Sequence, residues 1–219
     1  MKILSSRRLP QTILTLLLLV GGIQSHARAD VSFGYSNTVG SSIVFPGDTT
    51  FHFSPSVNNF QVTTGTAAGL LGQITGTFTI GSITTVGPVS SAPVTGTGAF
   101  IIHDGAFDLA GTLTWIDMSQ IGTADTLNFS GTVNLTAITY GGSNPDLLGL
   151  ANAGSGIDGL TFQFVPAQTL ATLRNGPGSH STSFSGTVVS VPEPGSAIVA
   201  LAGFATLALH CLRRKKNHA

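Results

Sequence analysis

The chain has 219 residues and a formal net charge of zero, but its charges are unevenly distributed along the sequence. Segment 30–191 contains one basic residue, Arg174, and eight aspartates, so its net charge is near −7 when every aspartate is ionised (one positive and eight negative charges). An acidic surface repels phosphate, and nucleic-acid binding needs a basic patch. The composition therefore excludes nucleic acid as a partner.

The N-terminus has the features of an export signal. Basic residues precede the short apolar run 13–20, and Ala27 and Ala29 supply the small side chains that a signal peptidase requires. We therefore expect residues 1–29 to be a signal peptide, with the mature chain beginning at Asp30 and signal peptidase as a processing partner.

Segment 30–190 is rich in Gly, Thr and Ser, and its apolar residues alternate with polar ones. Residues 72–80, 107–115 and 127–135 each show this period of two, which is typical of strands with one buried face. The sequence thus predicts one all-β domain, an antiparallel β-sandwich or jelly roll. The side chains expected to face the core are Ile74, Phe78, Ile80, Phe107, Leu109, Leu113, Trp115, Leu127, Phe129, Val133 and Leu135.

Turn-forming residues separate these strands. The pair Asp104-Gly105 predicts a tight hairpin, and residues 46–48 and 141–145 are loops by composition. Only residues 146–150 and 166–173 have a pattern compatible with a helical turn.

A five-residue segment occurs twice in this domain. Residues 129–133 read Phe-Ser-Gly-Thr-Val, and residues 184–188 repeat the same five residues. The spacing to related Gly-Thr segments is irregular, which argues against a solenoid. We interpret the repeat as a recurring strand pattern with Gly at a bend and Thr facing water; a decayed duplication is the alternative.

The domain has few charges with which to protect its strand edges. Proteins usually protect exposed edges with lysine, proline or inward charges, and this segment has no lysine. The edges are therefore expected to be covered by loops, or else to be open to strand-to-strand assembly. Cys211 is the only cysteine of the chain, so the domain must fold without an intrachain disulfide.

The histidines and carboxylates do not form a recognisable catalytic or metal motif. His52, His103 and His180 lack the close spacing of metal ligands, and the sequence has no Gly-x-Ser-x-Gly nucleophile motif. Asp104 and Asp108 are the one carboxylate pair that a hairpin could bring together for glycoside hydrolysis. We expect no catalytic residues, no metal and no cofactor, and we predict that the protein is not an enzyme.

Three weaker possibilities for ligand binding stay open. Asp146 and Asp158, with the glycine-rich segment between them, could supply oxygen ligands to calcium. Tyr35 and Tyr140 could stack on a sugar. Arg174 could bind an acidic sugar, although pairing with an aspartate for structural reasons is expected instead.

The C-terminus carries the most informative motif of the chain. Pro192, Glu193 and Pro194 precede an apolar run at 196–212, which is long enough to cross a bilayer. A basic cluster follows, and such a cluster holds its end of a membrane helix in the cytoplasm. The four residues of this cluster are Arg213, Arg214, Lys215 and Lys216.

This tail, residues 191–219, closely resembles the PEP-CTERM sorting signal. The resemblance implies recognition of Pro192, Glu193 and Pro194 by an exosortase, a membrane cysteine protease-transpeptidase of bacteria that make extracellular polysaccharide. In that family the tail is removed near the motif, so the helix 196–212 would anchor only an intermediate in the inner membrane. The resemblance does not extend to the domain 30–190.

Together these features predict an exported protein of the cell envelope or extracellular matrix. Its expected role is structural or adhesive and linked to exopolysaccharide or biofilm, with exopolysaccharide as a candidate partner. The alternative is a lectin-like carbohydrate-binding module, with or without calcium. Both roles fit a β-sandwich, and the fold alone does not distinguish them.

Overall fold

The computed structural model describes residues 31–122 and 127–191. The expected signal peptide with Ala27 and Ala29, and the expected sorting signal from Pro192 to Lys216, lie outside the described residues. Among the described residues, no helix combines the length and hydrophobicity that crossing a membrane requires.

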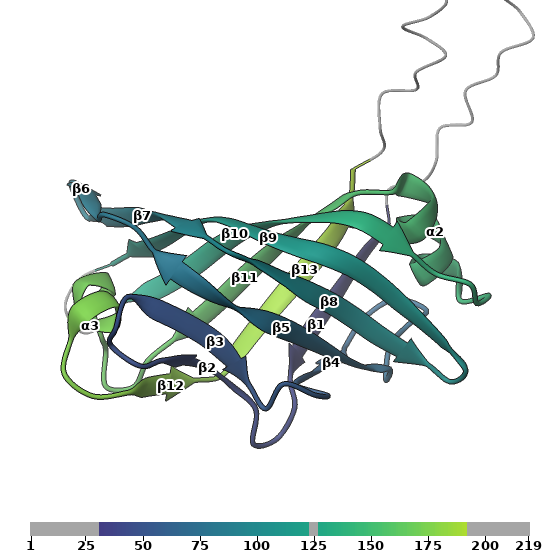
Figure 1. Cartoon of the computed structure of the whole chain (residues 1–219), viewed down its shortest axis with the longest axis horizontal. Helices are drawn as coiled ribbons and strands as arrows, with labels where there is room; N and C mark the ends of the chain where they lie inside the picture. The colour runs from purple at the N-terminus through teal and green to yellow at the C-terminus, as the bar shows by residue number, and fades with distance from the viewer. Residues whose placement is uncertain (1–30, 123–126, 192–219) are drawn as a thin grey trace, which may run out of the picture. The chain divides into compact units, whose positions relative to one another are not determined.

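The described chain consists of strands with two short helices (Figure 1). In chain order these elements are β1 (Ser32–Asn37), β2 (Ser42–Phe45), β3 (Thr50–Ser54), β4 (Phe60–Val62), β5 (Leu71–Ile80), β6 (Thr84–Val86), β7 (Val89–Thr95), β8 (Thr97–Asp104), β9 (Phe107–Ile121), β10 (Asn128–Thr139), α2 (Pro145–Ala153), β11 (Gly156–Gln163), α3 (Leu170–Asn175), β12 (His180–Thr182) and β13 (Phe184–Ser190).

The prediction of an antiparallel all-β domain is confirmed. The alternating side chains of β5, β9 and β10 point inward and outward as their period of two requires, and ten of the eleven expected core residues are buried. The exception is Phe107, whose side chain is 51% exposed. That prediction was wrong because Phe107 is the first residue after a hairpin turn, beyond the end of the core.

Eight of the strands form a closed ring of antiparallel pairs. The antiparallel pairings run β1–β13–β11–β10–β9–β8–β5–β4 and return from β4 to β1. The pairing of β4 with both β5 and β1 thus closes the sheet around the core. Closure gives each of these strands two neighbours, which removes the exposed edges that the low charge of the domain leaves unprotected.

The strands β5 and β9 extend beyond the part of the ring that contains β8. The C-terminal ends of β5 and β9 both pair with β7. In addition, β5 pairs with β3, and from β3 the sheet continues through β2 to β12. Within the described residues, the strand order ends at β12 and β6, which are three residues long each. Short edge strands of this kind offer little surface for assembly.

The predicted hairpin and helical turns are present. Asp104 pairs with Phe107, and Gly105 has a φ of 63°, a left-handed conformation that suits the first position of a two-residue hairpin turn. The helix α2 is capped by the side chain of Asn144, which accepts hydrogen bonds from two backbone N–H groups. The helix α3 is capped by Thr169, whose side chain accepts a hydrogen bond from the backbone N–H of Thr172.

The two helices lie at opposite ends of the sheet (Figure 1). The side chains of Leu147 and Leu150 in α2 are fully buried, as are those of Leu170 and Leu173 in α3. Each helix therefore covers one end of the core with two leucines, which keeps water from the aromatic interior.

Aromatic side chains fill much of this interior. The ring of Phe51 lies between Phe45 and Phe78, with centroid distances of 5.2 Å to both, and meets Trp115 edge-on at 4.7 Å. Such offset and edge-on contacts are the favoured geometries of aromatic pairs. The domain thus obtains from ring packing part of the stability that a disulfide would otherwise provide.

Candidate functional site

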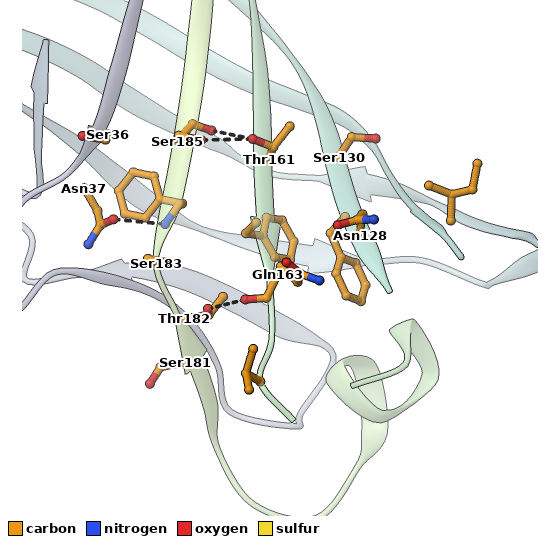
Figure 2. A pocket seen from close by; sticks show the side chains of 15 residues that line it. Ser36, Asn37, Asn128, Ser130, Thr161, Gln163, Ser181, Thr182, Ser183 and Ser185 are labelled. Carbon is orange, nitrogen blue, oxygen red and sulfur yellow. Dashed lines mark hydrogen bonds between the residues drawn. The ribbon is translucent and has the colours of Figure 1, made fainter. Parts of the chain in front are cut away.

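A groove of about 880 Å³ lies on the outer face of the sheet (Figure 2). Its walls come from β1, β9, β10, β11, β12 and β13, together with the segments that adjoin them. The polar side chains that line it are Ser36, Asn37, Asn128, Ser130, Thr161, Gln163, Ser181, Thr182, Ser183 and Ser185 (Figure 2).

The first two residues of each copy of the five-residue repeat, Phe-Ser, line this groove. Residues 129–133 and 184–188 pair with β11 from opposite sides, and both copies have the same register against it. Ser130 and Ser185 therefore stand directly opposite Thr161, one on each side. The glycines of the repeat occupy inward-facing positions within regular strands, so the interpretation of these residues as a bend was wrong. The threonines face outward, as predicted.

The hydroxyls form a row that crosses the strands. Ser119 of β9 bonds to Ser130 at 2.8 Å, and Thr161 bonds to Ser185 at 3.1 Å. Ser36 of β1 continues the row because it pairs with Ser185. Neighbouring strands lie about 4.8 Å apart. The floor of the groove therefore receives one hydroxyl-bearing residue from each of four neighbouring strands, and these residues are Ser130, Thr161, Ser185 and Ser36.

Amide side chains stand beside this row. Asn128 pairs with Gln163 across β10 and β11, and both side chains are exposed. Asn37 accepts a hydrogen bond from the backbone N–H of Phe184, and Thr182 donates to the carbonyl of Gln163 at 2.5 Å (Figure 2). Among the described residues, the side-chain amides of Asn128 and Gln163 form no hydrogen bonds. The donors and acceptors of both amides therefore face the groove without partners.

The lining of the groove is uncharged. None of the described residues that line it is acidic or basic, and the apolar side chains of Ile121 and Val165 add exposed rims, 55% and 94% exposed. Each hydroxyl and each amide both donates and accepts hydrogen bonds. The groove is thus suited chemically to a neutral ligand that carries many hydroxyl groups, because a charged ligand would find no counter-ion among these side chains.

The histidine and carboxylates of the β8–β9 hairpin lie elsewhere. The Nδ1 atom of His103 is 2.9 Å from Oδ1 of Asp108, and both side chains are substantially exposed, at 37% and 52%. Asp104 accepts a hydrogen bond from the hydroxyl of Tyr140. The two aspartates are thus engaged with different partners at a solvent-exposed turn, outside the groove.

The sequence-based calcium hypothesis is not supported in its original form. Asp146 accepts a hydrogen bond from the backbone N–H of Thr66 at 2.5 Å and stands at the start of α2. Asp158 is fully buried within β11 and does not lie in a loop. Within residues 31–122 and 127–191, no three His, Cys, Asp or Glu side chains gather in a way that could hold a metal ion.

Tyr35 and Arg174 also have structural surroundings. Tyr35 is 2% exposed and packs against Phe60 at 4.6 Å between ring centroids, so it offers no platform for a sugar. The Nε atom of Arg174 donates to the backbone carbonyl of Ile80 at 3.1 Å, which ties α3 to the end of β5. Within residues 31–122 and 127–191, Arg174 makes this backbone contact in place of the expected pairing with an aspartate.

A buried polar pair was missed by sequence reasoning. The hydroxyl of Tyr35 donates to Oδ2 of Asp158 at 2.7 Å, and Oδ1 of Asp158 is buried without a hydrogen-bond partner. Burial raises the pKa of Asp158 to about 7, although the hydrogen bond from Tyr35 acts in the opposite direction. Burial and the adjacent carboxyl together raise the pKa of Tyr35 well above its ordinary value.

No protein-family model matches this chain, and no curated protein or solved structure matches it either.

Proposed function

We propose that this chain is an exported protein of the cell envelope or extracellular matrix, with a structural or adhesive role and no enzymatic activity. The observation that carries the proposal is the C-terminal pattern of Pro192, Glu193 and Pro194, the apolar run 196–212 and the basic cluster 213–216. In this proposal an exosortase-type enzyme processes the tail after signal peptidase has removed residues 1–29. The inner-membrane form is then an intermediate, and the domain reaches the cell surface or the medium.

The first test is the C-terminal residue of the mature protein in its native host. Mass spectrometry of the envelope and medium fractions is expected to find a chain that ends near Pro192–Pro194. A matched host strain that expresses the variant Glu193→Ala is expected to retain the tail. An intact end at Ala219 in the mature wild-type protein would show a permanent membrane anchor and would overturn the sorting proposal.

A carbohydrate-binding role is the second candidate, and the groove favours it. Its hydroxyl row, its exposed amides and its lack of charge provide many neutral hydrogen-bonding groups along one open surface. We propose that the adhesive role consists of binding a neutral, hydroxyl-rich polysaccharide in this groove. The described side chains do not gather around a metal, so this binding is expected to be independent of calcium.

A binding assay with matched variants tests this role. We expect the full chain to bind a neutral glucan such as dextran with higher affinity than an acidic polysaccharide such as alginate. The affinity for dextran is expected to be the same with and without chelator. Asn128→Ala and Gln163→Ala each remove one groove amide and are expected to weaken dextran binding about tenfold, the loss typical of one good hydrogen bond.

The control is Asn134→Ala, which removes an exposed asparagine from the same strand, β10, outside the groove. This variant is expected to bind as the wild type does. Equal losses in all three variants, or no binding of either polysaccharide, would contradict the groove as a glycan site. Such a result would leave the sorting proposal intact, because that proposal is tested by the processed C-terminus alone.

A further inference from the structure

The pair formed by Tyr35 and Asp158 spans three neighbouring strands. Tyr35 lies on β1 and pairs in register with Gly186 of β13, whereas Asp158 lies on the next strand, β11. A side chain at Gly186 would collide with the phenol of Tyr35, so the ring lies over this glycine. The absence of a side chain at that position is what lets the hydroxyl of β1 reach a carboxyl two strands away.

This contact connects β1 to the body of the sheet at the point where the ring closes. The strand β1 pairs with β13 on one side and with the three-residue strand β4 on the other, and β4 has two register pairs with β5. The pairing on the β4 side is therefore short. On its other side, β1 has its longer pairing with β13. The hydrogen bond from Tyr35 to Asp158 reaches past β13 and adds a connection from β1 to β11.

The carboxyl has little to stabilise a negative charge. The residues in register with Asp158 on its two neighbouring strands are Val133 and Val188, both fully buried. Tyr35 is the only side chain in the described part of the chain that donates to it, and Tyr35 itself cannot ionise readily in that environment. Among the described residues no other titratable or charged group acts on this carboxyl, and Arg174, their only Lys or Arg, is engaged with Ile80.

We propose that Tyr35 and Asp158 form a proton-dependent clasp, which keeps β1 in the closed ring while the carboxyl is protonated. When the carboxyl is ionised, the single hydrogen bond from Tyr35 does not replace the water that the buried charge has lost, so β1 opens more readily to let water in. The energetic asymmetry has a simple origin. A neutral buried carboxyl with one unpaired oxygen costs far less than a buried carboxylate with a single donor. The contribution of this pair to the stability of the domain is thus larger in acid than at mildly alkaline pH, the reverse of the contribution of a carboxylate that is stabilised by hydrogen bonds in the folded state.

The sign follows from the direction of the pKa shift. The pKa of Asp158 is raised from 3.8 to about 7 in the folded state, so the stabilisation is complete below pH 3.8. Between these values the unfolded chain loses its proton and the folded one keeps it, which favours unfolding by about tenfold for each pH unit. The unfolding equilibrium constant is therefore expected to rise on the order of 1000-fold between pH 4 and pH 7 through this group, and to level off above pH 7.

The test is a pH series of urea unfolding curves for the full chain and two variants. Asp158→Asn keeps the shape of the side chain and removes its charge, so its stability is expected to lack the loss that we expect in the wild type between pH 4 and 7. Asp117→Asn is the control, because Asp117 is an exposed aspartate on β9, and it is expected to follow the wild-type profile.

A third variant separates the clasp from a purely structural role. Tyr35→Phe keeps the ring and removes the donor to the carboxylate, so it is expected to move the end of the loss above pH 7 and to make the total loss larger. Hydrogen exchange at pH 8 is expected to be faster in β1 of the wild type than in β1 of Asp158→Asn. The exchange rates of β8 are expected to differ less between these two proteins. A wild-type profile that matches Asp158→Asn at every pH, or equal exchange of β1 in the two proteins, would overturn the proposal.

Discussion

Replacing Gly131 or Gly186 by alanine is expected to destabilise the domain by about 2–3 kcal/mol, the upper range for overpacking a filled core. A Cβ atom at Gly131 would collide with the ring of Trp115, and one at Gly186 would collide with the ring of Tyr35. Both rings are almost fully buried, and because protein interiors are close-packed, moving either ring displaces its neighbours. The cost therefore falls on the backbone or on the packing of the rings.

Gly159→Ala is the matched control for this prediction. Gly159 lies on β11 between the two copies of the repeat, but a Cβ atom there would meet nothing within 4 Å. Removing the extra freedom of glycine from the unfolded chain is expected to leave the stability unchanged or to raise it by about 0.5 kcal/mol. Urea unfolding monitored by circular dichroism measures all three variants, and equal stabilities of the three would contradict the proposed role of the inward glycines.

This prediction gives the five-residue repeat a physical explanation. Each copy places phenylalanine and valine in the core and serine and threonine in water, and its inward glycine lies beneath an aromatic ring of the outer neighbouring strand. The two copies flank β11 in the same register, so the same local problem is solved twice with the same residues. This symmetry explains the identity of the segments without requiring a duplication of the chain.

The local features of the domain could be predicted from the sequence because they depend on neighbouring residues. The alternation in β5, β9 and β10 identified the strands and their buried faces, and Asp104-Gly105 identified the hairpin. The ring closure could not be predicted, because it joins β1 to β13 from opposite ends of the domain. A period of two says which face of a strand is buried, but not which strand lies beside it.

The candidate groove illustrates the same limit. Ser130, Thr161 and Ser185 are each recognisable in the sequence as outward residues, but only the register brings them into one row. Asp158 was considered only as a possible calcium ligand, because the glycines around it obscured the strand pattern. In the structure Asp158 takes an inward position that an apolar residue would ordinarily occupy.

The substitution Trp115→Ala is expected to cost about 4 kcal/mol of unfolding free energy, within the range for large aromatic residues in a core. Trp115 is 2% exposed and contacts the rings of Phe51, Phe53 and Phe78. Its indole N–H donates to the backbone carbonyl of Asp117 at 2.6 Å. The variant loses these contacts and leaves a cavity at the centre of the aromatic cluster.

The double variant Trp115→Ala with Gly131→Ala then tests whether the ring and the glycine depend on each other. Once the indole is gone, the added methyl group at position 131 no longer collides with it, so the second substitution is expected to cost at least 1 kcal/mol less than it does alone.

Trp115→Phe keeps a ring at the site and is expected to lose about half as much unfolding free energy as Trp115→Ala, which provides a measurable protein if the alanine variant does not fold. Strictly additive losses in the cycle, repeated with Phe in place of Ala at position 115, would show that the glycine does not serve to accommodate the ring. The inward glycine of the first repeat would then be explained by its backbone, and the parallel with Gly186 and Tyr35 would no longer hold.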